Sequence, residues 1–415
     1  MSQNQSDIAI IVGIAKNGSQ LKECEISLDE LSRLADTAGA SVYSRVIQVK
    51  DSYDPRTLIG SGKVKEIAEL VKNSDVNLII FDEELSPAQI RNLESDIGDV
   101  TVIDRSMLIL DIFALHAVSG EGKLQVELAQ LKYTAPRLVG HGLELSRQGG
   151  GIGSRGPGES KLETDRRHLH EKIVSLEERL RELESNRATM RSQRDRSGLV
   201  KIALVGYTNA GKSTLLNKIT GANVLSEDKL FATLDPTTRK TTLPSGEEVL
   251  FTDTVGFIRK LPHHLVKAFK STLDEVKYAD ILLIVSDASD SEVLNQIDVT
   301  EKVIEELEAA GKPIIYVYNK CDLGINEFIN TNAENSVFVS AKSEQGITDL
   351  LLNIEKIIKE QKVELKLSIP YSEQSVVSQI YNEYVVKNTE YSDDGIIIEA
   401  IFDERGKGLY KKYII

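Results

Sequence analysis

The stretch Leu199-Val-Lys-Ile-Ala-Leu-Val-Gly-Tyr-Thr-Asn-Ala-Gly-Lys-Ser213 decides the fold of the region around it. Its mostly apolar first seven residues predict a buried strand, and the residues after it (TLLNKIT) have helical spacing. In this strand–loop–helix context, the glycine-rich loop fits the pattern that binds nucleotide phosphates through backbone N–H groups and a helix N-terminus. We expect phosphate contacts along Gly206, Tyr207, Thr208, Asn209, Ala210, Gly211, Lys212, Ser213 and Thr214.

Two metal-binding positions are expected around this loop. Lys212 should place its charge on the β- and γ-phosphates, and the Ser213 hydroxyl should bind Mg²⁺. A second strand, residues 249–252, ends at a carboxylate that can hold the ion directly or through a water. Since the Gly256 N–H can reach the γ-phosphate, the residues after it can sense whether that phosphate is present. This second segment consists of Asp253, Thr254, Val255 and Gly256.

A third segment selects the base. A strand at residues 313–318 is followed by Asn319-Lys-Cys-Asp322, and the Asp322 carboxylate is a pure acceptor. Guanine offers two adjacent donors to such a group, whereas adenine offers an unprotonated nitrogen, so GTP and GDP are predicted and an ATP-driven RNA remodeller is disfavoured. The Lys320 stem can lie along the base. The base site comprises Asn319, Lys320, Cys321 and Asp322, with Ser340, Ala341 and Lys342 after a strand at residues 337–339 donating to guanine O6.

Between the first two segments, residues 230–239 form a predicted loop rich in hydroxyls. One threonine of this loop should complete the Mg²⁺ shell when GTP is bound. Thr233, Thr237 and Thr238 all qualify on chemistry alone.

Strands and helices alternate on both sides of this region, so the fold class is α/β. We expect an N-terminal α/β domain at 1–118, including a helix that starts at Ser27 with Glu30 completing a capping box, and a second capped helix starting at Ser86-Pro87. Leucines at spacings of 3 and 4 predict an antiparallel pair of helices, a hairpin arm with a glycine-rich loop at 119–198. The GTPase domain should span 199–362. A small C-terminal α/β domain at 363–415 should hold one helix and strands at 395–402 and 409–414.

Composition limits the surroundings and partners of the chain. The 415 residues carry a formal net charge of −14, which disfavours a general DNA coat but allows a local basic patch to contact RNA. Two cysteines far apart in the sequence cannot form a disulfide scaffold or a zinc cluster. The amino end has no signal pattern, and the longest apolar stretch includes Asp111 and His116. We therefore expect a cytoplasmic protein without integral membrane contact.

The chain resembles the HflX family of ribosome-associated GTPases, within the translation-factor-related P-loop class. The resemblance rests on the Asp-Thr-Val-Gly-Phe-Ile motif at 253–258, on 137–142 (RLVGHG) and 149–161 (GGGIGSRGPGESK), and on the first switch, Phe231, Ala232, Thr233, Leu234 and Asp235. It implies Thr233 as the first-switch Mg²⁺ ligand, catalytic roles for Lys212, Thr233 and Gly256, and a monomer. It also implies binding to rRNA and proteins of the large ribosomal subunit, and splitting of stalled or stressed ribosomes.

Three interpretations stay open. Phe257 stands where many GTPases have a water-orienting glutamine, so either hydrolysis is slow until a partner completes the site, or the ring simply packs against the sheet. The arginines around the glycine-rich loop either clamp RNA or pair with glutamates; they are Arg137, Arg147, Arg155, Arg166 and Arg167. Finally, GTP either drives ribosome splitting or times release of a ribosome-assembly or RNA-binding switch.

Overall fold

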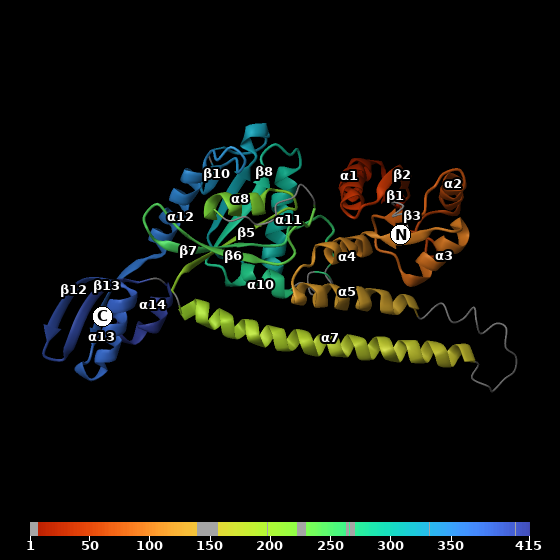
Figure 1. Ribbon diagram of the computed structural model, residues 1–415. Helices are drawn as coiled ribbons and strands as arrows, with labels where there is room; N and C mark the ends of the chain where they lie inside the picture. The colour runs from red at the N-terminus through yellow and green to blue at the C-terminus, as the bar shows by residue number, and fades with distance from the viewer. Residues whose placement is uncertain are drawn as a thin grey trace.

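Three separate β-sheets organise the computed structural model of this chain (Figure 1). The structure describes residues 7–138, 157–196, 198–221, 230–262, 265, 270–331, 333–402 and 404–415. The glycine-rich stretch with Arg147 and Arg155 lies outside these residues. In the described part of the chain, no helix is both long and apolar enough to cross a membrane.

The first sheet is parallel, as the alternating pattern predicted, and its strand order is β2-β1-β3-β4. Its strands are β1 (Ile8–Ala15), β2 (Ser41–Val49), β3 (Leu78–Phe81) and β4 (Thr101–Asp104). Two helices cover each face of this sheet. One face is covered by α1 (Leu21–Thr37) and α4 (Arg105–His116), and the other by α2 (Ser61–Lys72) and α3 (Pro87–Ile97). We call residues 8–116 the N-terminal unit.

One expected helix start in this unit is confirmed and the other is wrong. Ser86 caps α3 through a complete capping box with Gln89. By contrast, α1 begins at Leu21, so Ser27 and Glu30 lie in the middle of the helix. Their side chains serve other partners, because Ser27 donates to Asp82 and Glu30 pairs with a buried arginine. A capping-box pattern alone does not distinguish these two situations.

Two helices form the predicted arm. Helix α5 (Gly120–Leu138) and helix α7 (Pro157–Arg196) run antiparallel and in contact, with α7 extending well beyond α5 (Figure 1). Ion pairs of 2.7 Å join Lys132 to Glu177 and Lys172 to Glu127 across the pair. The amino end of α5 directly follows α4, so the arm starts at the N-terminal unit.

The second sheet has strand order β10-β9-β8-β5-β7-β6 and is parallel except for β6. Its strands are β5 (Val200–Gly206), β6 (Thr237–Thr242), β7 (Glu248–Asp253), β8 (Ile281–Asp287), β9 (Ile314–Asn319) and β10 (Ser336–Phe338). Helices cover both faces: α8 (Lys212–Thr220) and α12 (Ile347–Gln361) on one, α10 (Lys270–Tyr278) and α11 (Val293–Glu306) on the other. The predicted loop at 230–239 therefore ends in an antiparallel edge strand.

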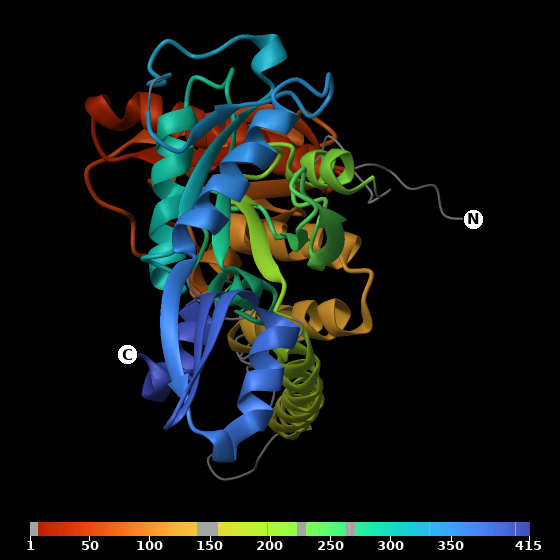
Figure 2. The ribbon, with the colours of Figure 1, turned by 90° about the vertical axis from the view of Figure 1, so that its left-hand side faces the viewer.

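The third sheet is antiparallel, with order β11-β13-β12, and lies beside the carboxyl end of α7 (Figures 1 and 2). It contains β11 (Val363–Ile369), β12 (Val385–Ser392) and β13 (Gly395–Phe402), with helices α13 (Gln374–Glu383) and α14 (Glu404–Leu409). The expected strand at 409–414 is wrong. Tyr410 and Tyr413 are both buried, at the three-residue spacing of the helical turn Lys411–Tyr413. The strands β11 and β12 were not anticipated. β12 is largely polar and exposed, whereas β11 (VELKLSI) alternates apolar and polar residues, which was a usable strand signal.

Candidate functional site

The phosphate loop leaves β5 at a point where only glycine fits. Gly206 has φ of +143°, and a Cβ on it would lie 2.1 Å from the carbonyl oxygen of Val285. The Lys212 ammonium folds back over the loop and donates to the carbonyls of Gly206 (3.0 Å) and Tyr207 (2.8 Å). Burial lowers the pKa of Lys212 to about 8, and a phosphate beside the ammonium would favour its charged form again.

Three oxygen-bearing side chains meet beside the loop. The Ser213 hydroxyl donates to Asp253 Oδ2 at 2.6 Å and lies 2.9 Å from Thr233 Oγ1. Asp253 is fully buried, and its Oδ1 has no hydrogen-bond partner among the described residues. Burial raises the pKa of this carboxyl group. An unpartnered carboxylate oxygen next to two hydroxyls is the kind of donor set that a hard cation such as Mg²⁺ takes.

Gly256 lets residues 253–258, which we call the second switch, approach the phosphate loop closely. A Cβ at this position would lie 2.8 Å from Thr208 Cα and 3.1 Å from Lys212 Nζ. The pocket between these segments is lined by the following residues: Thr208, Asn209, Gly211, Lys212, Ser213, Thr214, Phe231, Ala232, Thr233, Thr254 and Gly256. The structure thus brings most of the residues expected in the phosphate loop and the two switches around one hollow, whereas the residues expected at the base are not part of this lining.

The base-selecting segments are braced against the phosphate loop. Asn319 donates to the Ala210 carbonyl (2.9 Å) and accepts from the Ala341 N–H (3.0 Å), so its amide joins both loops. Lys320 is held by an ion pair of 2.8 Å with Asp287, at the carboxyl end of β8. The Asp322 side chain is exposed at the rim. Asp287 was not expected at the site from the sequence, although an aspartate at the end of a buried strand beside this site was a usable signal.

Several residues were expected to contact the nucleotide, but their side chains contact the N-terminal unit instead. Tyr207, Leu234 and Val255 belong to the hydrophobic cluster that contains α1 and α4 residues. The Asp235 carboxylate binds the start of α5. These side chains connect the two switches to the front half of the chain rather than lining the phosphate pocket.

The Phe257 ring packs into the core beneath the sheet. It is 1% exposed and belongs to the cluster on the α10 and α11 face. Its backbone pairs with the phosphate loop, donating to the Gly206 carbonyl (3.0 Å) and accepting from Thr208 N–H (2.8 Å). The ring therefore anchors the second switch and is not among the pocket-lining residues.

This packing predicts the behaviour of Phe257 variants. Phe257→Ala should lower the free energy of unfolding by about 3–5 kcal/mol, since it removes a buried ring. Phe257→Leu should keep unstimulated GTP turnover within about threefold of the wild type, because leucine fills much of the same space. The measurement is phosphate release per molecule able to bind labelled GDP. A loss in Phe257→Leu as large as in Lys212→Ala would show that the ring acts in the chemistry.

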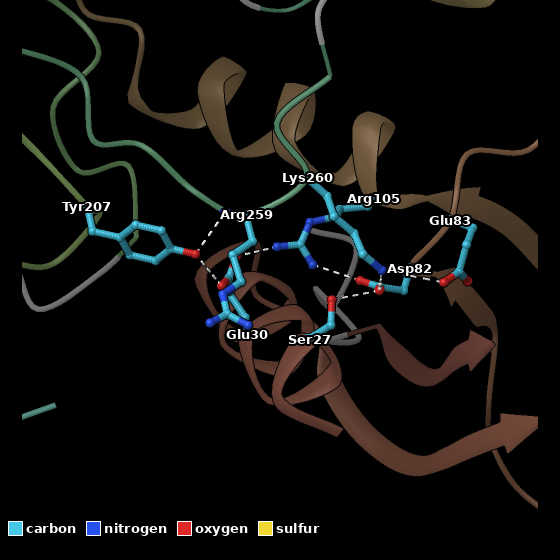
Figure 3. A network of polar contacts seen from close by, with 8 residues as sticks. All are labelled: Ser27, Glu30, Asp82, Glu83, Arg105, Tyr207, Arg259 and Lys260. Atoms are coloured by element: carbon cyan, nitrogen blue, oxygen red, sulfur yellow. Dashed lines mark hydrogen bonds and ion pairs between the residues drawn. The ribbon is translucent and has the colours of Figure 1, made fainter. Parts of the chain in front are cut away.

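A polar network joins the second switch and the phosphate loop to the N-terminal unit (Figure 3). The Tyr207 hydroxyl donates to Glu30 and accepts from the Arg259 N–H at 2.7 Å. Lys260 pairs with Asp82, to which Ser27 also donates at 2.7 Å. The phosphate loop and the residues that follow the second switch are therefore both hydrogen-bonded or ion-paired to the N-terminal unit.

Arg105 lies at the centre of this network. It is 2% exposed and pairs with Asp82 at 2.7 Å and with Glu30. Burial alone would raise the pKa of Asp82, but the charges of Arg105 and Lys260 outweigh it and hold that pKa below its ordinary value. Burial raises the pKa of Glu30 and raises that of Glu83 to about 7.

A phosphate loop at the carboxyl end of a central strand, two segments converging on it and a separate base loop define a P-loop nucleotide-binding protein of the GTPase class. Comparison with known proteins agrees with this class. Family models match four successive regions: "GTP-binding GTPase N-terminal" at 25–114, "GTP-binding GTPase Middle Region" at 116–194, "50S ribosome-binding GTPase" at 201–320 and "HflX C-terminal domain" at 328–405.

Curated relatives named GTPase HflX align along nearly the whole chain. The protein of Lacrimispora saccharolytica is 47% identical over 94% of this chain and 92% of its own length. That of Escherichia coli is 42% identical over 91% and 90%. A GTP-binding protein of Sulfolobus solfataricus, solved in complex with GDP, aligns with a TM-score of 0.44 and 24% identity over 85% of this chain and 99% of its own. The chain belongs to the HflX family of GTPases; it binds guanine nucleotides and hydrolyses GTP.

Proposed function

We propose that this GTPase depends on Mg²⁺ and acts in the cytoplasm on the large ribosomal subunit, where GTP binding drives the splitting or rescue of stalled ribosomes. One observation carries the proposal furthest: both switches pack against the N-terminal unit, through Leu230, Phe231, Val255 and Ile258. A change at the γ-phosphate therefore reaches the front half of the chain. The match of residues 201–320 to the family of 50S ribosome-binding GTPases favours the large subunit as the partner.

Four parts of the chain would share this function. Residues 1–118 and the arm at 119–198 would form the ribosome-facing half, 199–362 the GTPase domain, and 363–415 a small C-terminal domain. In hydrolysis, a water attacks the γ-phosphorus, the bond to the β–γ bridging oxygen breaks, and GDP and phosphate leave. Ser213 and Thr233 would hold Mg²⁺, with Asp253 directly or through a water. The ion would neutralise charge on the β- and γ-phosphates.

Two further groups would take part in catalysis, one on the phosphate loop and one on the second switch. Lys212 would neutralise phosphate charge, and the Gly256 N–H would orient the γ-phosphate. No glutamine follows Gly256, and Phe257 is buried, so this position offers no side chain to align the attacking water. Slow hydrolysis without the ribosome follows.

The hydroxyls of Ser213 and Thr233 give a direct test of the Mg²⁺ assignment. Ser213→Ala and Thr233→Ala should each lower Mg²⁺-dependent GTP turnover at least about tenfold, because even outer-shell metal partners typically contribute that much. Thr238→Ala is the matched control, since the Thr238 hydroxyl lies 2.9 Å from that of Thr252, away from Ser213. Turnover is measured as phosphate release across a Mg²⁺ titration. Equal effects at Thr233 and Thr238 would reject Thr233 as the ligand.

Ribosome splitting is tested on purified intact ribosomes. With the protein and a non-hydrolysable GTP analogue, sucrose gradients should show conversion of joined ribosomes into subunits, and little conversion with GDP. The alternative is a GTP-timed assembly or RNA-binding switch, which would bind the large subunit and leave joined ribosomes intact. Intact ribosomes at saturating protein and analogue would reject splitting in favour of this alternative.

A further inference from the structure

The carboxylate of Asp235 ties the first switch to the arm. Its Oδ2 accepts from the backbone N–H of Ser119 at 2.8 Å and from that of Val118 at 3.2 Å, and its Oδ1 accepts from the Ser119 hydroxyl. That hydroxyl in turn accepts from the Gly122 N–H at 2.8 Å, as an N-cap does. A single negative charge thus satisfies N–H groups at the amino end of α5, where the helix dipole favours it.

The arm is shaped to receive this carboxylate. A Cβ on Gly122 would lie 2.6 Å from Asp235 Oδ1 and 3.1 Å from the Ser119 hydroxyl. Any side chain at position 122 would therefore push the carboxylate away from the helix end. Here φ is not positive, so the glycine is needed for space rather than for backbone conformation.

A second anchor holds the same segment. Phe231 is 2% exposed with φ of +57°, and its ring lies edge-on to Phe113 of α4, with 4.7 Å between the ring centroids. Thr233 stands between these anchors, two residues from each. Its hydroxyl lies 2.9 Å from that of Ser213, and the two anchoring contacts on either side of it lie outside the GTPase sheet.

We propose that Asp235 is a positioning residue: its bonds to Val118 and Ser119 hold the first switch closed, so that closure over GTP and docking of the arm helix occur together. We call Asp235, Val118, Ser119 and Gly122 the switch–arm latch. This inference rests on the proposed role of Thr233 as the Mg²⁺ ligand of the GTP state. Because coupling is reciprocal, GTP should tighten the latch and the latch should tighten GTP binding by the same factor.

The latch predicts a loss confined to the triphosphate. In the full-length protein, Asp235→Ala and Gly122→Ala should weaken binding of a fluorescent non-hydrolysable GTP analogue by about 5- to 150-fold, the usual range of such coupling, and change GDP binding less than about twofold. Gly122→Ala is informative because alanine favours a helix, so a purely structural effect on α5 would be neutral or stabilising. Asp349→Asn, an exposed aspartate in the first turn of α12, is the control.

Hydrogen exchange gives a readout that does not depend on Thr233. In the wild type, the amides of Val118 and Ser119 should exchange more slowly with the GTP analogue than with GDP, and Asp235→Ala should abolish that difference. Equal exchange with both nucleotides in the wild type, or equal loss of GDP and analogue affinity in the variants, would overturn the latch. If exchange depends on the nucleotide but Thr233→Ala binds the analogue normally, the latch stands and the Mg²⁺ assignment of Thr233 fails.

Discussion

Asp322→Asn is expected to change the nucleotide preference of the protein from GTP to XTP. The carboxylate accepts from two adjacent guanine donors, and asparagine replaces one acceptor by an NH₂ donor, which would face the guanine amino group. Xanthine carries an oxygen at that position, so the amide can donate to it. Affinity for GTP should fall by about 10- to 100-fold, in line with ~1–3 kcal/mol for a bidentate base contact, while affinity for XTP rises.

The neighbouring aspartate supplies a matched control. Asp287 pairs with Lys320 at 2.8 Å and has no expected contact with the base edge. Asp287→Asn should therefore weaken GTP and XTP binding to a similar extent, because it loosens the lysine stem that covers the base. Competition of both nucleotides against labelled GDP measures the two effects. Unchanged GTP affinity in Asp322→Asn would remove this residue from the base site.

Replacement of Arg105 should produce the largest loss of stability in the N-terminal unit. Arg105→Met leaves the Glu30 carboxylate and one oxygen of Asp82 buried without their cation, and removal of one partner from a buried ion pair typically costs about 3–5 kcal/mol. The change is measured as the shift of the urea transition of this unit, followed by hydrogen exchange of β1 and β3 amides.

Arg56→Met is the control for this change, because Arg56 lies on the same unit and also pairs with a carboxylate, that of Asp96, but is exposed. Its effect on the free energy of unfolding should be small, because water screens an exposed ion pair. The Arg105 deficit should also shrink as the pH falls. The pKa of Asp82 is lowered in the folded protein, so its contribution is present above the unfolded pKa and is lost as pH falls through the folded pKa. Equal losses for both arginines would contradict the buried-network account.

The nucleotide site could be predicted closely because its chemistry is local. A phosphate loop needs its glycines, lysine and hydroxyl within eight residues, and a strand before them, so the sequence from Gly206 to Ser213 is sufficient evidence. The structure then places Thr233, rather than Thr238, beside Ser213. That choice depends on where the first switch is anchored, and the anchors lie in another part of the chain.

The interface between the two halves was not predictable in the same way. Glu30 and Tyr207 are 177 residues apart and meet only in the folded chain. The pattern from Ser27 to Glu30 suggested a helix start because a capping box and a buried polar pair both use hydroxyls and carboxylates. Asp235 was assigned to the nucleotide by its place in a motif, whereas its carboxylate binds α5. In both segments the direction of the side chains determines which partners they bind, and the spacing of residues in the sequence does not determine that direction.

We propose that the nucleotide site and the front half of the chain work together as one ribosome-dependent GTPase. The most direct measurement is multiple-turnover phosphate release from GTP by the full-length protein, alone and with purified large or small ribosomal subunits. We expect slow release by the protein alone, strong stimulation by large subunits, no stimulation by small subunits, and loss of the response in Lys212→Ala. Release that is unchanged by saturating large subunits would contradict a ribosome-dependent GTPase.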